Sequence, residues 1–212
     1  MSILNVEHLS HGFGDRAIFQ DVSFRLLKGE HIGLVGANGE GKSTFMNIIT
    51  GKLMPDEGKV EWPGRVTVGY LDQQSTLEAG KTIREVLRTA FNDMYEAEKQ
   101  MLELYDKMAE AAPEEIDKMM NTVGEIQTEL EHSGFYSLDT KIEEVANGLG
   151  LSSIGLDRDV SELSGGQRSK VLLTKLLLQN SSILLLDEPT NYLDVEHIEW
   201  LTRFLQNYEH AF

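Results

Sequence analysis

Residues 36–44 read GANGEGKST, and this stretch decides the fold of the chain. It fits the pattern G-x-x-x-x-G-K-[ST], in which glycines leave backbone N–H groups free to surround a phosphate. The apolar run HIGLV at 31–35 precedes it, and a helix is expected from about Lys42 to Thr50. A strand, a glycine-rich turn and a helix in this order predict a phosphate-binding loop at a helix N-terminus. A glycine-rich turn that holds no ligand is the alternative.

Two side chains of this loop carry specific chemistry. Lys42 is expected to reach the β- and γ-phosphates of a nucleotide, and the Ser43 hydroxyl is expected to coordinate Mg²⁺. The residues of this stretch expected to bind ATP are Gly36, Ala37, Asn38, Gly39, Glu40, Gly41, Lys42, Ser43 and Thr44.

A pair of carboxylates follows a second apolar run. The run Ile183–Leu186 predicts a strand, and Asp187 would lie at its C-terminal end, where ligand sites of α/β proteins form. Asp187 suits a Mg²⁺ ligand, and Glu188 is positioned to polarise a water for attack on the γ-phosphate. The alternative is an ordinary solvated strand end.

The stretch LSGGQRSK at 163–170 opens another expected helix. Ser164 and Gln167 fit a capping box, which explains an ordinary helix start. The two intervening glycines, Gly165 and Gly166, add something that a cap does not need. Bare backbone at a helix start allows close contact with an anion, so a second phosphate contact is the other interpretation.

Length and composition limit the kind of protein. With 212 residues and 41% hydrophobic content, the chain can bury the core of one domain, with room for an insertion. It contains no cysteine, and a net charge of −16 argues against non-specific nucleic-acid binding. The N-terminus does not resemble a signal peptide, and no apolar run is long enough to span a bilayer. We therefore expect a soluble, cytoplasmic chain with no transmembrane segment.

The order of the expected elements indicates an α/β fold. Strands are predicted in SILNVEHLS, RAIFQDVSFRL, EHIGLVG, KVEW and RVTVGYL, and later in SILLLD. Helices are predicted in DTKIEEVANGLG, after LSGGQ, and in DVEHIEWLTRFLQNY. Strands separated by helices imply a largely parallel core sheet covered by helices.

The middle of the chain has a different pattern. Two apolar seams, the first from Leu87 to Met108 and the second from Ile116 to Leu130, flank the break at 111–113. They predict an antiparallel helical hairpin. Residues 92–132 contain twelve acidic and three basic side chains, a net charge of −9. A solvated acidic face is the simplest explanation of this charge.

Taken together, these motifs resemble the ATP-binding-cassette (ABC) ATPases. The phosphate-binding loop, LSGGQ as the signature, LLLDEP as Walker B and NYLD as the D-loop, with Asp194, occur in the family's order. The resemblance implies that Gln73 senses Mg²⁺ and the γ-phosphate, with Gln74 as the competing candidate. It also implies that Phe13 stacks on adenine, although an ordinary hairpin phenylalanine is the alternative.

The sequence NYLD is similar to the corresponding motif of the soluble F subfamily, whose members carry two cassettes and act on the ribosome. In that subfamily a helical arm lies between the glutamine loop and the signature, and here 91 positions separate Gln73 from Ser164. The implied fold is an ABC nucleotide-binding domain with an antiparallel β subdomain and an inserted helical hairpin. The implied domains are a core at 1–82 and 135–212, the first cassette, and a hairpin at 83–134.

The resemblance also implies partners. Ser164, Gly165, Gly166 and Gln167 would act on an ATP held by a second cassette, in the same full-length chain or in a second copy. The ribosome, with its RNA, is the expected larger partner, although the acidic hairpin is an unusual surface for contacting RNA. The family's switch histidine is expected beyond Phe212, since neither His197 nor His210 fits its position, so the isolated chain should be a poor ATPase. The ATPase subunit of a membrane transporter and a nucleotide-gated binding module are the alternative functions.

Overall fold

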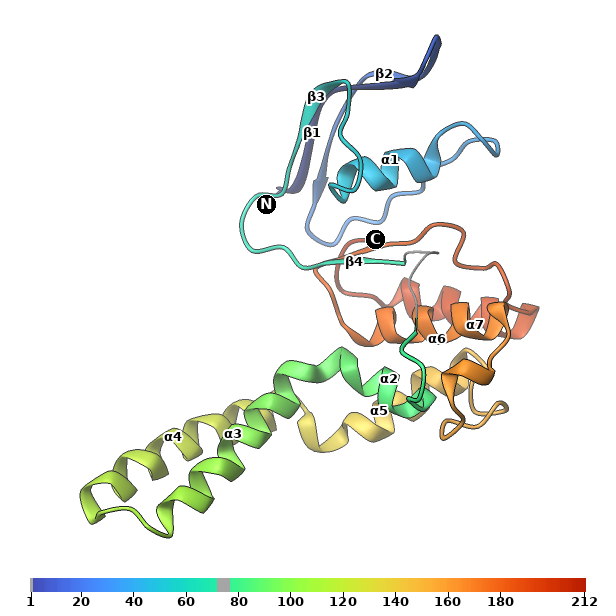
Figure 1. The fold of residues 1–212 in the computed structure, drawn as a ribbon. Coiled ribbons are helices and arrows are strands. Elements are labelled where there is room, and N and C mark those ends of the chain that lie inside the picture. The colour runs from blue at the N-terminus through green and yellow to red at the C-terminus, as the bar shows by residue number, and fades with distance from the viewer. Residues whose placement is uncertain (1, 72–76) are drawn as a thin grey trace.

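The N-terminal part of the chain forms an antiparallel sheet with strand order β2-β1-β3. The computed structural model describes residues 2–71 and 77–212. β1 (Ser2–Phe13) pairs with both β2 (Arg16–Leu27) and β3 (Glu57–Glu61). Helix α1 (Lys42–Ile49) lies against this sheet in the upper part of Figure 1. Apolar residues of the strands and of α1 share one core, to which α1 contributes the buried Ile48 and Ile49 of its last turn.

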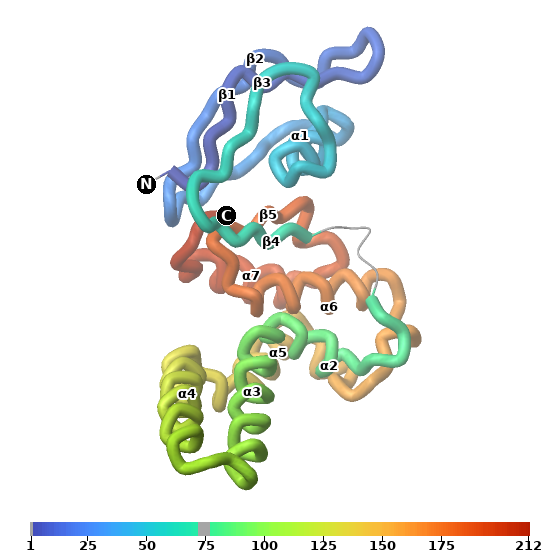
Figure 2. Tube along the Cα trace, turned by 60° about the vertical axis from the view of Figure 1, so that its left-hand side comes forward, coloured from blue at the N-terminus to red at the C-terminus, as the bar shows by residue number. Residues whose placement is uncertain are grey.

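A short parallel pair of strands lies below this sheet (Figure 2). β4 (Val68–Tyr70) pairs with β5 (Ile183–Leu185) although the two are far apart in sequence. Side chains of a strand alternate between its two faces. Accordingly, Ile183 and Leu185 belong to the core of the antiparallel sheet, whereas Leu184 belongs to a second core formed by helices. β5 therefore connects the two cores.

The second core is helical and contains most of the buried apolar side chains of the C-terminal half. Its fully buried residues include Leu87, Ile142, Leu149 and Val171. The helices that supply it are α2 (Ile83–Arg88), α5 (Leu138–Gly148), α6 (Gly165–Leu178) and α7 (Val195–Gln206). Three 3-10 turns connect helices, at Thr89–Phe91, Phe135–Ser137 and Val160–Glu162.

Helices α3 (Asn92–Met108) and α4 (Pro113–His132) form an antiparallel pair that extends away from the rest of the molecule (Figures 1 and 2). No residue of α3 is buried, whereas Val123 and Leu130 of α4 are. We name these two helices and their connection, residues 92–132, the arm. The domain boundaries that we expected from the sequence remain a prediction.

The structure corrects one predicted element. Residues 31–35 were expected to form a strand, but they have no strand conformation, and Ile32, Leu34 and Val35 are exposed. Backbone hydrogen bonds connect Ile32 N to Phe212 O and Phe212 N to Glu30 O, at 2.9 and 3.3 Å. These two bonds engage the backbone of Glu30 and Ile32, not that of residues 33–35. A strand needs a partner along its length, and an apolar sequence alone does not supply one.

Candidate nucleotide-binding site

The loop of residues 36–41 leads into α1 and is open to solvent over most of its length. Gly41, the N-cap of α1, has a φ of 94°, in the left-handed region that favours glycine. A Cβ at Gly41 would also clash with Ile18 Cγ2 of β2. Position 41 therefore requires glycine both for its backbone conformation and for its close contact with the sheet.

Lys42 and Glu40 bind backbone groups of the same loop. Lys42 Nζ donates to Gly36 O at 2.8 Å and to Ala37 O at 3.0 Å. The Ala37 N–H donates to Glu40 Oε2 at 2.7 Å. The expected phosphate-binding lysine thus lies over the loop that would surround the phosphates.

Two of the three predicted magnesium ligands, Ser43 and Asp187, meet although 144 residues separate them in sequence. Ser43 Oγ, in the first turn of α1, donates to Asp187 Oδ2 at 2.5 Å. Asp187 follows β5, so the parallel strand carries its carboxylate to the N-terminus of α1. A hydroxyl and a carboxylate oxygen are ligands that Mg²⁺ accepts, together with substrate phosphates and water. Within residues 2–71 and 77–212, no group of three or more His, Asp or Glu side chains could hold a metal without such additional ligands.

Glu188 lies next to Asp187 and is exposed. Its φ is 48°, a left-handed conformation that residues with a side chain rarely adopt. Asn191 Nδ2 donates to Glu188 Oε2 at 2.8 Å. Asn191 is the first residue of the NYLD motif, but no role was expected for its side chain. Its spacing of three residues from Glu188, within a turn, was the available signal.

The signature residues form the start of α6. Ser164 is the N-cap: Ser164 N donates to Gln167 Oε1 at 2.9 Å, and Gln167 N donates to Ser164 Oγ at 3.3 Å. The capping box considered in the sequence analysis is therefore present. Gly165 has open space where a side chain would be, whereas the Tyr192 ring packs against Gly166. A capping box leaves Gly165 accessible, so it is compatible with a contact to an anion.

The segment that precedes the signature is attached to the start of α2. Val160 N donates to Lys81 O at 2.9 Å, and Ile83 N donates to Arg158 O at 3.0 Å. The Ser161 hydrogen bonds, including one from its backbone N–H at 2.7 Å, lower the pKa of Asp159. This segment fixes the direction in which α6 begins.

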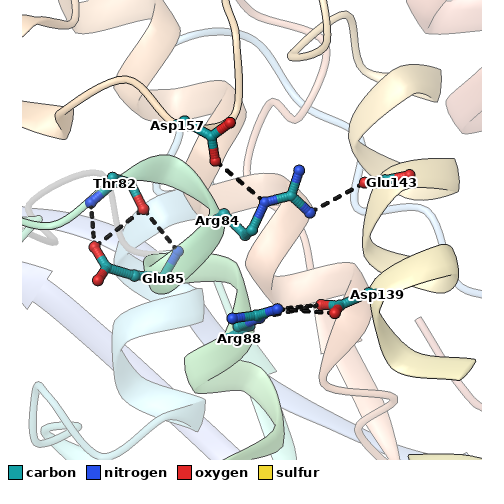
Figure 3. A network of polar contacts seen from close by, with 7 residues as sticks. All are labelled: Thr82, Arg84, Glu85, Arg88, Asp139, Glu143 and Asp157. Carbon is teal, nitrogen blue, oxygen red and sulfur yellow. Dashed lines mark hydrogen bonds and ion pairs between the residues drawn. The ribbon is translucent and has the colours of Figure 1, made fainter. Parts of the chain in front are cut away.

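Charged side chains connect α2 to neighbouring elements, as Figure 3 shows. Arg84 Nη1 binds Glu143 Oε1 of α5 at 3.1 Å, and Arg84 Nε binds Asp157 Oδ1 at 3.3 Å. Arg88 binds both carboxylate oxygens of Asp139, the closest contact being 2.8 Å. The hydrogen bonds to Glu143 and Asp157 raise the pKa of Arg84.

Phe13 lies at the end of β1 and is 57% exposed. Its ring meets His11 edge-on, with ring centroids 5.0 Å apart. The stacking of Phe13 on a base remains a prediction. Asp194 caps α7, since His197 N donates to Asp194 Oδ1 at 3.2 Å. Gln73 and Gln74 lie outside the described residues.

A glycine-rich loop with its lysine, at a helix N-terminus beside a carboxylate that ends a parallel strand, defines a P-loop nucleotide-binding protein. The family model described as ABC transporter matches residues 19–191. The chain therefore belongs to the ABC transporter family. Within residues 2–71 and 77–212, no helix is long and apolar enough to cross a membrane.

Three curated relatives match almost the whole chain. The ABC transporter ATP-binding protein YfmM of Bacillus subtilis is 68% identical over 212 residues, which are 100% of this chain and 41% of YfmM. The energy-dependent translational throttle protein EttA of Mycobacterium tuberculosis is 36% identical over 99% of this chain and 37% of EttA. The ABC transporter F family member 2 of Arabidopsis thaliana is 35% identical over 95% of this chain and 30% of its own length. The chain thus spans less than half of each, and the resemblance to the F subfamily is confirmed.

A solved structure supports the fold. The ATP-binding subunit of an ABC transporter superposes with a TM-score of 0.66 and 21% identity, over 98% of this chain and 75% of that chain. The ABC nucleotide-binding fold predicted from the sequence is therefore confirmed. The roles of the individual site residues remain predictions.

Proposed function

We propose that this chain binds and hydrolyses ATP as the first cassette of a twin-cassette protein of the F subfamily that acts on the ribosome. The contact between Ser43 and Asp187 carries this proposal, because it joins the phosphate-binding loop to the segment after β5 that contains the catalytic candidate Glu188. EttA, named as a translational throttle protein, matches 99% of this chain and supports a role in translation. The place of action would then be the cytoplasm.

In this proposal the loop holds the phosphates and the strand end holds the catalytic groups. Backbone N–H groups of residues 36–44 and the Lys42 ammonium bind the β- and γ-phosphates of ATP. Phe13 stacks on adenine. Ser43, Asp187 and Gln73 would hold Mg²⁺, which would neutralise charge on the phosphate oxygens. Glu188 accepts a proton from the water that attacks the γ-phosphate.

The signature residues act on a second nucleotide. Ser164, Gly165, Gly166 and Gln167 begin α6, and Asp194 begins α7. In the proposed assembly they face the ATP of a second cassette, in the same full-length chain or in a second copy. By itself the chain would hydrolyse ATP weakly, because no opposing signature completes its own site.

Glu188→Gln tests the proposed hydrolysis. The variant keeps the size of the side chain but is a poor proton acceptor, so ATP binding should persist while turnover in the full-length protein falls by about 100-fold or more. Binding is measured with a fluorescent ATP analogue, and turnover by phosphate release. Wild-type turnover in the variant would remove Glu188 from the mechanism.

The ATPase subunit of a membrane transporter is the second candidate, because the superposed structure is a subunit of that kind. Sedimentation of the full-length Glu188→Gln protein from a lysate with ATP separates the two functions. Retention with ribosomes that depends on ATP supports the first proposal. Retention with membranes, and none with ribosomes, would support the second.

A further inference from the structure

A tight turn follows β5 and contains the catalytic candidate Glu188. Asn191 N donates to Glu188 O at 3.1 Å, and Leu193 N donates to Thr190 O at 3.1 Å. Glu188 and Tyr192 both have positive φ, at 48° and 70°. A conformation that costs energy persists only where the surroundings enforce it, and such positions cluster at functional sites.

The turn is also attached at its far end. The Tyr192 ring packs against Gly166, because a Cβ at Gly166 would lie 3.2–3.4 Å from Tyr192 atoms. Two residues further on, Asp194 caps α7. The backbone of Asn191 is therefore held between β5, α6 and α7.

Within this turn the side chain of Asn191 reaches the carboxylate of Glu188. Nδ2 donates to Oε2 at 2.8 Å, a normal hydrogen-bond length, and both residues are exposed. An exposed glutamate without a partner samples several rotamers, whereas this hydrogen bond selects one. The amide is neutral and has no proton to lose near pH 7, so it orients Glu188 without adding charge beside it.

We propose that Asn191 is a positioning residue for Glu188. Its amide holds the carboxylate in the rotamer from which Glu188 accepts the proton of the attacking water. This inference rests on the proposed ATP hydrolysis, since it assigns a role in that reaction to the first residue of NYLD, a motif in which only Asp194 was given a role.

Asn191→Ala removes the donor and leaves the backbone turn in place. Turnover should fall about 10- to 100-fold, because a misplaced catalytic group loses most of its advantage. KM for ATP should stay within about twofold, because the hydrogen bonds of Asn191 in the described structure go to Glu188 and not to the phosphate-binding loop. Asn207→Ala is the matched control, since Asn207 Nδ2 donates to Arg203 O at 2.8 Å at the opposite end of α7. It should leave kcat unchanged.

Asn191→Leu separates positioning from a merely structural role. Leucine has nearly the same size as asparagine and no charge, but it cannot donate a hydrogen bond to Glu188. kcat should be as low as in Asn191→Ala, with KM for ATP within about twofold of wild type. Asn191→Gln, which keeps an amide donor, should restore part of kcat. A merely structural role would leave kcat in Asn191→Leu near wild type.

All variants are measured in the full-length protein, with Glu188→Gln giving the turnover that does not use this site. If Glu188→Gln is inactive while Asn191→Ala or Asn191→Leu has wild-type kcat, the inference about Asn191 is wrong and the proposed function stands. If Glu188→Gln retains wild-type turnover, both the proposed mechanism and the role of Asn191 are wrong.

Discussion

Replacing Gly41 by alanine should destabilise the protein through two separate effects. The φ of 94° lies in the left-handed region, where a residue with a Cβ costs about 1–2 kcal/mol. The new Cβ would also clash with Ile18 Cγ2, and overpacking of this kind typically costs about 1–3 kcal/mol. Gly41→Ala should therefore lower the free energy of unfolding by about 2–5 kcal/mol.

Gly39→Ala provides a matched control in the same loop. Gly39 has a φ of 85°, but a Cβ there has no atom within 4 Å. Only the backbone cost of about 1–2 kcal/mol applies, so Gly39→Ala should lower the free energy of unfolding less than Gly41→Ala does. The difference between the free energies of unfolding of the two variants measures the cost of the clash with β2.

A double-mutant cycle with Ile18→Ala tests the proposed clash directly. Alanine at position 18 removes the offending methyl group, so the pair should be more stable than the two single changes predict, by about 1–3 kcal/mol. Urea unfolding followed by tryptophan fluorescence measures this, because Trp62 Nε1 donates to Ile49 O at the end of α1. Additive effects, or equal losses for Gly39→Ala and Gly41→Ala, would refute the reasoning.

Three further predictions concern other parts of the molecule. Ser43→Ala should weaken binding of a fluorescent ATP analogue in Mg²⁺ but change it little in EDTA, because the hydroxyl acts through the metal. Burial raises the pKa of Tyr208 from 10 to about 12. The contribution of protonated Tyr208 to the free energy of unfolding should therefore be complete below pH 10 and decrease as the pH rises towards 12. The decrease should be smaller in Tyr208→Phe. Arg88→Ala, which breaks a partly exposed ion pair, should cost less than about 1 kcal/mol in urea unfolding, and less still at high salt.

Local patterns in the sequence were sufficient for the elements that depend on local chemistry. The seams that flank residues 111–113 predict the two helices of the arm, and helices α3 and α4 occupy the expected places. The capping box at Ser164 depends only on residues within one turn, and both of its hydrogen bonds are present.

Features that depend on distant partners could not be predicted in the same way. Residues 31–35 have the composition of a buried strand, but their conformation depends on the segment that pairs with them. The hydrogen bond from Asn191 to Glu188 depends on a left-handed backbone at Glu188, which no pattern of residue types indicated. The role expected for Gln73 stays a prediction, since it lies outside the described residues.

The alternating side chains of β5 have a consequence for folding during synthesis. Ile183 and Leu185 complete one core and Leu184 completes the other, and all three follow β4 by more than 110 residues. As the chain leaves the ribosome, β1, β2 and β3 can pair early, but both cores stay open until β5 emerges. Apolar surface of both cores then remains uncovered while residues 71–182 are synthesised, and chains that stop before β5 should be substrates for chaperones and proteases.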